Sequence, residues 1–332
     1  MTVSRTNKNV CLFCFGDLDK KRVCLSCGRR AEDEPTPAHR LPPRLLLNGK
    51  YLIVRTLGEG GFGITYLAWD AVCGEKVAIK EYFPTGFVTR APRSADVLYR
   101  KENRTAASRG LKRFTAEARI LAEVQGLSGI VSVLDYFCEN ETAYIVMEYL
   151  DGISLKKYVA KKGGRLPVSD VLGIMRPIMD SLIPVHEKGL IHRDISPDNI
   201  IITKNGKVKL IDFGAAKQTN PEGKSLSIVL KQGFAPEEQY RTHGEQGPWT
   251  DVYALAATIY YCITGQMPPE SIQRLVKDTI MRPSELGVKI ATSRENALMK
   301  ALSVYKKNRY ETVKQFAAAL YRKPRADSAG NQ

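Results

Sequence analysis

Long apolar runs are missing from this sequence of 332 residues. The longest run, Val252 to Ile263, is interrupted by Thr258 and is far shorter than the roughly 20 residues that cross a bilayer, so we expect no membrane span. Residues 1–10 are polar and lack the apolar core of a signal peptide. These two absences predict a cytoplasmic chain whose cysteines are kept reduced.

Acidic residues are also scarce. Against 50 Lys and Arg there are 35 Asp and Glu, which gives a formal net charge of +15. The positive electrostatic field of such a chain favours phosphate-rich ligands, nucleic acid or acidic proteins, and the charge alone does not distinguish among them. The hydrophobic content of 43% and charged content of 26% exclude wholesale disorder. The length suits a two-lobed domain with a small appendage.

The cysteines are few and unevenly placed. Four of the seven form two Cys-x-x-Cys pairs, at Cys11, Cys14, Cys24 and Cys27. Each pair can place two thiolates on one turn, so that four sulfurs surround Zn²⁺ as a tetrahedron. Disulfides or free thiols are the alternative, which the missing secretory signal disfavours. We therefore expect a zinc knuckle over residues 1–30 that depends on its metal to fold.

The task of this knuckle is open at the level of the sequence. Four closed sulfur ligands leave no position for catalysis, which favours a structural clip that docks a protein partner or targets the chain. Basic side chains nearby keep nucleic-acid binding as a second, less favoured function class: Lys20, Lys21, Arg22, Arg29 and Arg30.

Proline-rich residues 31–48 predict a semi-extended linker, so a folded domain should begin near residue 49. Five runs rich in β-branched and aromatic residues then predict a sheet with one helix near Arg113 to Val124. The predicted strands cover residues 51–58, 63–70, 75–83, 130–137 and 143–150.

The remainder has helical character, for example over residues 171–189 and 252–265. One exception is a predicted hairpin that turns at Asn205 and Gly206. The pattern predicts an α+β fold, with a small β-rich part over about residues 49–150 and a larger helical part over about 151–322. Residues 323–332 read as a disordered tail.

A glycine-rich segment joins the first two predicted strands. The residues Gly58, Glu59, Gly60, Gly61, Phe62 and Gly63 match GxGxxG, a pattern whose backbone can approach phosphates closely. A dinucleotide-binding loop should open a helix, yet Ile64 to Trp69 continues as a strand. Taken alone, the segment is equally consistent with a hairpin that binds nothing.

Two charged residues follow this segment in apolar surroundings. Strand alternation sends Ala78 and Lys80 to the same face, and Glu117 lies on the inward side of the predicted helix. An ion pair between Lys80 and Glu117 would aim the ammonium at α- and β-phosphates. The alternative is an exposed lysine and a solvated glutamate.

Further along the chain come His192-Arg193-Asp194, then Asn199, then Asp212-Phe213-Gly214. With these motifs in this order, the sequence resembles the bacterial-type members of the eukaryotic-like serine/threonine protein kinase family over about Tyr51 to Leu320. The resemblance implies a bilobal kinase fold over residues 49–322. It also implies transfer of the γ-phosphate of ATP to Ser or Thr hydroxyls of protein substrates.

The resemblance assigns a role to each motif residue. Asp194 would orient or deprotonate the substrate hydroxyl, while Asn199 and Asp212 would bind Mg²⁺ or Mn²⁺. Met147 would stand behind the adenine, which Ala78 and Ile201 would sandwich. The residues implied to bind ATP are Leu57, Gly58, Glu59, Gly60, Gly61, Phe62, Gly63, Thr65, Ala78, Lys80, Glu148, Leu150 and Ile201. Asp251 would anchor the catalytic loop, and Arg309 would pair with Glu237 or Glu238.

One position departs from the family. Serine/threonine kinases usually carry a lysine two residues after the catalytic aspartate, and here that residue is Ser196. Loss of a cation beside the transferred phosphate would slow the chemistry unless another basic group replaces it. The rival hypothesis is therefore an ATP-binding pseudokinase that acts as a scaffold.

Two segments predict regulation. Residues 84–113 are long and basic, which predicts either a functional or a disordered loop and leaves docking of a partner or nucleic acid open. Residues 215–234 would form the activation loop, with Thr219, Ser225 and Ser227 as hydroxyl groups. We expect autophosphorylation at Ser225 or Ser227, with Arg193 available to pair with the phosphate.

Overall fold

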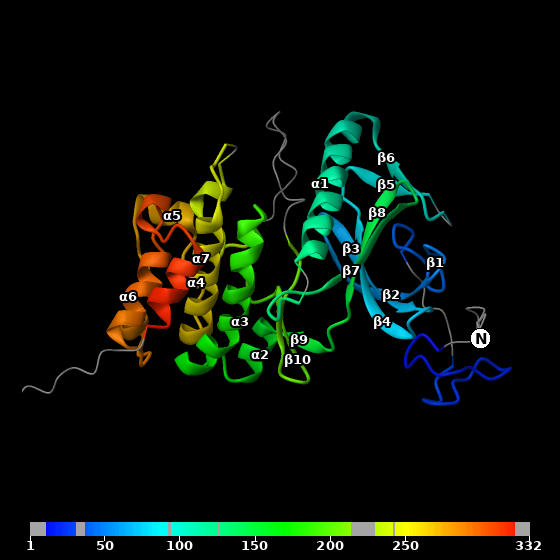
Figure 1. The fold of residues 1–332 in the computed structure, drawn as a ribbon, viewed down its shortest axis with the longest axis horizontal. Helices are drawn as coiled ribbons and strands as arrows, with labels where there is room; N and C mark the ends of the chain where they lie inside the picture. Colours follow the sequence, from blue (N-terminus) through cyan, green and yellow to red (C-terminus); the bar gives the residue numbers. More distant parts are fainter. Residues whose placement is uncertain are drawn as a thin grey trace, which may run out of the picture. The chain divides into compact units, whose positions relative to one another are not determined.

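The computed structural model describes residues 11–30, 37–91, 94–124, 126–213, 230–241 and 243–322. The chain divides into two compact units (Figure 1). The N-terminal unit contains the chain up to Glu123 together with Ser132–Leu150, and the helical unit contains Val124–Val131 together with the chain from Asp151 onward. A β-rich unit and a helical unit agree with the α+β expectation. In the described part of the chain, no helix is long and apolar enough to cross a membrane.

A six-stranded antiparallel sheet forms the N-terminal unit, with strand order β1-β2-β3-β4-β8-β7. Five of these strands were expected from the sequence. The sixth, β1, pairs with β2 through Leu47 and Tyr51 and comes from the proposed linker. The strands are β1 (Leu46–Leu47), β2 (Tyr51–Gly60), β3 (Gly63–Asp70), β4 (Glu75–Tyr82), β7 (Val133–Glu139) and β8 (Thr142–Glu148).

Residues 37–48, which we call the strap, pack against this sheet. Leu41 and Leu47 are each 1% exposed and belong to the same core cluster as Tyr66 and Ile79. The backbone N–H of Leu41 donates to Tyr66 Oη at 3.1 Å. The prolines do keep the strap out of long regular structure, but its leucines bury apolar area that stabilises the unit.

The basic segment 84–113 is folded in its described residues. It forms the hairpin β5 (Val88–Arg90) and β6 (Val97–Tyr99), the short helix η1 (Lys101–Asn103) and the start of α1 (Arg104–Glu123). Arg90 is buried and forms an ion pair with the buried Glu81, whose carboxylate also accepts from Tyr66 Oη and Tyr144 Oη. This pairing gives Arg90 a structural role in the core. Figure 1 shows α1 beside β7 and β8, which it contacts.

The helical unit is built around a helix that is buried on nearly all sides. This helix, α4 (Pro248–Thr264), is surrounded by α3, α6 and α7, and its apolar surface on every face explains the continuous apolar run in its sequence. The other helices are α2 (Leu155–Lys161), α3 (Val168–Glu187), η3 (Glu237–Gln239), α5 (Ser271–Val276), η4 (Pro283–Leu286), α6 (Thr292–Ala301), η5 (Lys306–Asn308) and α7 (Val313–Leu320).

A small sheet of this unit carries the predicted hairpin. Strands β10 (Ile200–Thr203) and β11 (Val208–Leu210) pair antiparallel, and β9 (Gly152–Ser154) adds to β10. Gly206 has φ +79°, the left-handed conformation that the turn needs, so the predicted hairpin is confirmed.

Candidate functional site

The glycine-rich segment forms the tight connection between β2 and β3. Gly60 pairs with Gly63 across the turn. A Cβ on Gly63 would meet the carbonyl oxygen of Glu81 at 2.4 Å, so packing explains this glycine. At Gly58, Gly60 and Gly61 no described atom lies within 4 Å of an added Cβ. Packing within the unit therefore does not require these three glycines, whereas close approach of phosphates to the backbone would.

The strap holds the tip of this segment through Glu59. The carboxylate of Glu59 contacts His39 Nε2 at 3.0 Å and accepts from Arg40 Nε at 2.9 Å. Burial alone would raise the pKa of Glu59, but His39 and Arg40 lower it below its ordinary value. Sequence reasoning missed both strap residues because they lie far from Glu59 along the chain.

Strand β4 presents the predicted phosphate and adenine residues on one face. Lys80 lies opposite Thr65 on β3, and Ala78 lies opposite Met147 on β8. Glu117 is 5% exposed on α1 in the same unit. The strand pairing thus places Ala78 and Lys80 on one face of β4, as strand alternation predicted.

The end of β8 is fixed by a reciprocal pair of bonds. The N–H of Glu148 donates to the carbonyl oxygen of Ser132 at 3.1 Å, and Glu148 Oε1 accepts from the N–H of Ser132 at 2.8 Å. These bonds hold the position where the resemblance puts an adenine contact.

In the helical unit, Asp194 and Asn199 are joined directly. Asn199 Nδ2 donates to the carbonyl oxygen and to Oδ2 of Asp194, both at 2.8 Å. The amide donors are therefore directed to Asp194, which leaves Asn199 Oδ1 as an oxygen ligand for a hard cation. Asp194 thus has a restrained carboxylate next to an amide oxygen that could bind a metal.

Asp251 anchors the loop that carries Asp194. It is 0% exposed and accepts from the backbone N–H groups of His192 at 2.8 Å and Arg193 at 2.9 Å, while His186 Nε2 lies 2.8 Å from its Oδ2. Burial by itself would raise the pKa of Asp251, but His186 and the loop amides lower it. The left-handed conformation of Arg193, at φ +66°, is held by this anchor.

Asp212 follows β11 and also has a left-handed backbone, with φ +61°. Its neighbours are fixed by His192, whose Nε2 lies 3.0 Å from the carbonyl oxygen of Ile211 and whose ring centre lies 4.4 Å from that of Phe213. Ile201 pairs with Ser154 and Lys209 in the small sheet. Gly214, Thr219, Ser225 and Ser227 lie outside the described residues.

The sequence left Glu237 and Glu238 as alternative partners of Arg309, and the structure selects Glu238. Arg309 donates to both carboxylate oxygens of Glu238, at 2.7 and 2.9 Å, and both side chains are buried. The neighbouring Gln239 Nε2 donates to the carbonyl oxygen of Arg193 at 2.9 Å. The segment before α4 is thereby tied to the loop that carries Asp194.

Ser196 is fully buried, and its hydroxyl receives a hydrogen bond from Lys231 Nζ at 2.8 Å. The same ammonium lies 3.8 Å from Asp194 Oδ2. Sequence reasoning did not single out Lys231, because nothing local marks a lysine that reaches back over so many residues.

The four knuckle cysteines converge. Their sulfurs all lie within 4.8 Å of one another, with Cys11 Sγ 3.8 Å from Cys27 Sγ and Cys14 Sγ 3.3 Å from Cys24 Sγ. A tetrahedral Zn²⁺ with bonds of about 2.3 Å needs sulfurs about 3.8 Å apart, so the donor set fits zinc. Amides of Ser26 and Cys27 each donate to Cys24 Sγ at 3.4 Å.

These amides affect the ionisation of the cluster. Burial raises the pKa of Cys24, but the donors from Cys27 and Ser26 and the thiol of Cys14 lower it to about 6. For Cys14, the amide of Gly16 acts to lower the pKa, yet the neighbouring thiols raise it to about 12. The backbone therefore favours the thiolate at Cys24, which is the form that binds metal.

The knuckle, residues 11–30, contacts β3 and β4 through Phe15. The ring of Phe15 stacks on Trp69, and Lys76 Nζ lies 5.0 Å from the centre of the Phe15 ring. The knuckle is thus attached to the N-terminal unit by an aromatic contact as well as by the chain.

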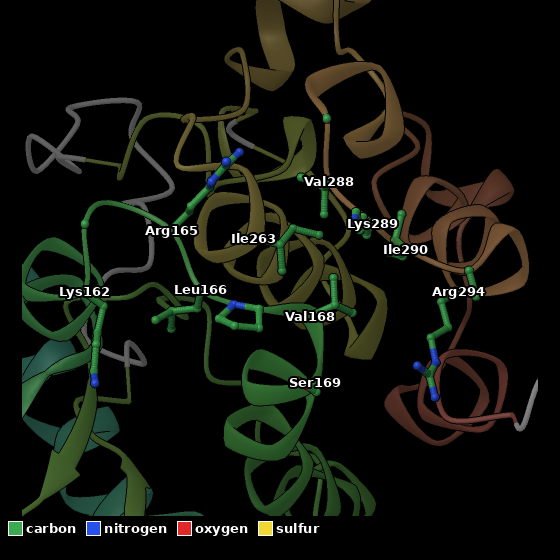
Figure 2. A pocket seen from close by; sticks show the side chains of 14 residues that line it. Lys162, Arg165, Leu166, Val168, Ser169, Ile263, Val288, Lys289, Ile290 and Arg294 are labelled. Carbon is green, nitrogen blue, oxygen red and sulfur yellow. The ribbon is translucent and has the colours of Figure 1, made fainter.

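A separate cavity of about 670 Å³ opens in the helical unit (Figure 2). Leu166, Val168 and Ile263 form apolar walls. None of the residues predicted to bind ATP or metal lines it. Four cationic residues also border it: Lys162, Arg165, Lys289 and Arg294.

Comparison with known proteins agrees with this geometry. Residues 51–326 match the family described as "Protein kinase domain". Serine/threonine-protein kinase Pkn1 of Myxococcus xanthus is 30% identical over 82% of this chain and 38% of its own length. Serine/threonine-protein kinase C of Synechocystis is 35% identical over 68% of this chain and 41% of its own length. The chain therefore spans less than half the length of these curated relatives.

A solved structure titled "PpkA-294 apo form" is 34% identical and has a TM-score of 0.75. The match covers 85% of this chain and 99% of that one.

Proposed function

Because the chain belongs to the protein kinase domain family, we propose that it transfers the γ-phosphate of ATP to serine or threonine hydroxyls of proteins. The observation that carries the proposal is the pair formed by Asp194 and Asn199. The amide of Asn199 holds the carboxylate of Asp194, and its oxygen can bind a metal. Phosphoryl transfer requires a proton acceptor and a metal ligand side by side in this way.

Asp194 accepts the proton of the substrate hydroxyl as the new bond to phosphorus forms. Its Oδ2 is restrained by Asn199 and the loop amides are restrained by Asp251, so little reorganisation is needed. When bound, ATP supplies the phosphoryl group, and Mg²⁺ or Mn²⁺ neutralises the charge on its oxygens. Asn199 Oδ1 and the carboxylate of Asp212 would hold the metal.

The N-terminal unit contributes nucleotide binding. The exposed glycines 58, 60 and 61 allow phosphates to approach the backbone closely, and Lys80 adds a cation. The remaining proposed contacts are Leu57, Glu59, Phe62, Gly63, Thr65, Ala78, Glu148, Leu150 and Ile201. Glu117 would position Lys80.

The pseudokinase hypothesis is not favoured, since the residues proposed for proton handling and metal binding are all present. For Zn²⁺ we propose a structural role in the knuckle, based on the convergent sulfurs. Protein substrates follow from the proposed activity. A docking partner for the knuckle, and a cytoplasmic location, are also part of the proposal, while a nucleic-acid partner is the less favoured option.

The decisive test compares phosphate transfer from γ-labelled ATP to a generic basic protein by the wild-type chain and by Asp194→Asn. We expect the variant to lose at least about 10²-fold in rate, because proton handling by a positioned group contributes that much. Lys314→Ala, an exposed position on α7, serves as the matched control. Equal labelling by the wild type and by Asp194→Asn would overturn the proposal.

Autophosphorylation is tested separately. Mapping of modified residues after incubation with ATP and Mg²⁺ should find phosphate on Ser225 or Ser227 in the wild type and on neither in Asp194→Asn. An active enzyme with both serines unmodified would contradict this part of the proposal.

A further inference from the structure

The loop that carries Asp194 has no lysine at the position where the family usually has one, but a lysine from another segment reaches it. At the position two residues after Asp194 the chain has the small, fully buried Ser196. The ammonium of Lys231 reaches this position from another segment, 2.8 Å from Ser196 Oγ and 3.8 Å from Asp194 Oδ2. A positive charge therefore lies next to the carboxylate to which we assign the proton transfer.

The backbone around Lys231 is fixed by a tight turn. Its carbonyl oxygen accepts from the N–H groups of Phe234 at 3.0 Å and Ala235 at 3.1 Å. Gly233 has φ +77°, and a Cβ there would meet the carbonyl oxygen of Pro268 at 2.6 Å. The turn as it is built therefore requires glycine at this position.

Two buried contacts attach the turn to the rest of the helical unit. Ser271 Oγ donates to the carbonyl oxygen of Ala235 at 2.8 Å, and Glu238 forms its bidentate pair with Arg309. The ammonium of Lys231 is therefore delivered by a supported element, which catalytic groups need for accurate placement.

The orientation of Asp194 also fits this arrangement. Its Oδ2 receives one bond from Asn199 and lies within ion-pair distance of Lys231. The side chain of Lys231 is 28% exposed and that of Asp194 is 11% exposed. A lysine ammonium carries three N–H donors, so Lys231 can bond to Ser196 and also contact a ligand.

We propose that Lys231 is a catalytic residue that contacts the transferred γ-phosphoryl group, and that Ser196 positions its ammonium. The assignment rests on the proposed kinase function. In the reaction, the bond between the γ-phosphorus and the bridging oxygen breaks and its electron pair leaves with ADP. The substrate hydroxyl oxygen bonds to phosphorus, and its proton passes to Asp194. Lys231 keeps its protons and offsets charge on the equatorial oxygens.

Ser196 and Lys231 lie on two segments that meet in space. The proposal therefore predicts that the lysine can be moved from position 231 to position 196 without losing its effect. Lys231→Ser combined with Ser196→Lys should return an ammonium to nearly the same position from the catalytic loop, whereas Lys231→Ala should leave the position without charge.

The test measures the single-turnover rate at saturating ATP, together with the affinities for ATP and ADP. We expect Lys231→Ala to lower the rate by about 10²-fold, as removal of one preorganised donor does, and to leave ADP affinity unchanged because ADP has no γ-phosphate. The double variant should be at least about tenfold faster than Lys231→Ala. Lys314→Ala is the control for loss of an exposed lysine.

Folding is checked by Tm and by ADP binding. If Lys231→Ala does not fold, it is replaced by Lys231→Gln, which keeps a polar side chain without the charge. A Lys231 variant with a rate within about threefold of the wild type would overturn the assignment while leaving the kinase function intact. A double variant as slow as Lys231→Ala would indicate that Lys231 only stabilises the structure, and would overturn its catalytic role. A wild-type chain no faster than Asp194→Asn would overturn the kinase function itself.

Discussion

The ring of Phe15 stacks on the indole of Trp69, with ring centres 4.9 Å apart and planes inclined by 23°. Phe15 has φ +67°, and the corresponding residue of the second Cys-x-x-Cys turn is Gly28, with φ +69°. In both turns the N–H of this residue donates to the carbonyl oxygen of the first cysteine. A bulky residue in this conformation costs about 1–2 kcal/mol, which the aromatic contact offsets.

Replacement of Phe15 by glycine should release the knuckle from the sheet without unfolding it. The substitution removes the backbone strain and also the stacking, which is worth about 0.5–1.5 kcal/mol beyond buried area. We expect zinc content to be unchanged and hydrogen exchange in β3 to increase. Phe13→Ala, which removes an exposed ring of the same turn, is the matched control. Unchanged exchange in β3 would contradict this prediction.

Zinc should be bound at one ion per chain and should be required for the knuckle to fold. We expect Cys24→Ser to lose the metal, because the remaining three sulfurs cannot complete the tetrahedron. Elemental analysis of the purified protein measures the stoichiometry. Cys138→Ser, at an exposed thiol outside the cluster, should retain one ion. If Cys24→Ser retained a full equivalent of zinc, the four-cysteine site would be wrong.

Local pattern explains what was predicted correctly. The hairpin at Asn205 and Gly206, the strand after the glycine-rich segment and the apolar helix α4 are each encoded by neighbouring residues. A turn residue or a hydrophobic period is visible within one short stretch. The spacing of the cysteines belongs to the same class, since each turn of the knuckle is local.

Contacts between distant segments explain what was missed. The prolines of the strap predict a linker, whereas Leu41 and Leu47 are buried against a sheet that is formed by later residues. Likewise, Lys231 reaches Ser196 from a segment that lies far along the chain. The hydrophobic pattern of a sequence cannot predict these contacts between distant residues, because they depend on how the elements pack together.

Loss of Arg309 should destabilise the helical unit strongly. Arg309→Ala would leave the carboxylate of Glu238 buried without its bidentate partner, which costs about 3–5 kcal/mol in comparable buried pairs. Urea unfolding measures the change. Arg241→Ala removes an arginine with a 57% exposed side chain that pairs with the adjacent Glu237, and should cost less than about 1 kcal/mol. Similar losses for the two variants would contradict the structural role of the buried pair.

Asp251 should contribute stability that disappears in acid. Its pKa is lower in the folded chain than its ordinary value of about 3.9, so its ionised form favours folding at pH values above about 4. This contribution declines as pH falls through the lower folded-state pKa. We expect Asp251→Asn to be less stable than the wild type at neutral pH and the difference to shrink below pH of about 4. Urea midpoints at several pH values test this, with the exposed Asp180→Asn as control.

The contact between the strap and Glu59 should influence nucleotide binding. His39 and Arg40 hold Glu59 at the tip of the glycine-rich segment, and they lower its pKa despite partial burial, so that the carboxylate is ionised at neutral pH. Glu59→Gln removes the charge while keeping the size of the side chain. Because partly exposed ion pairs are worth about 0–1 kcal/mol each, we expect the KM for ATP to rise about two- to fivefold, with faster hydrogen exchange over residues 57–63. Arg119→Ala, which breaks an exposed pair on α1, should change neither quantity. If exchange accelerates in Glu59→Gln but the KM for ATP stays constant, the strap restrains the segment without affecting the nucleotide, and the predicted link between them is wrong.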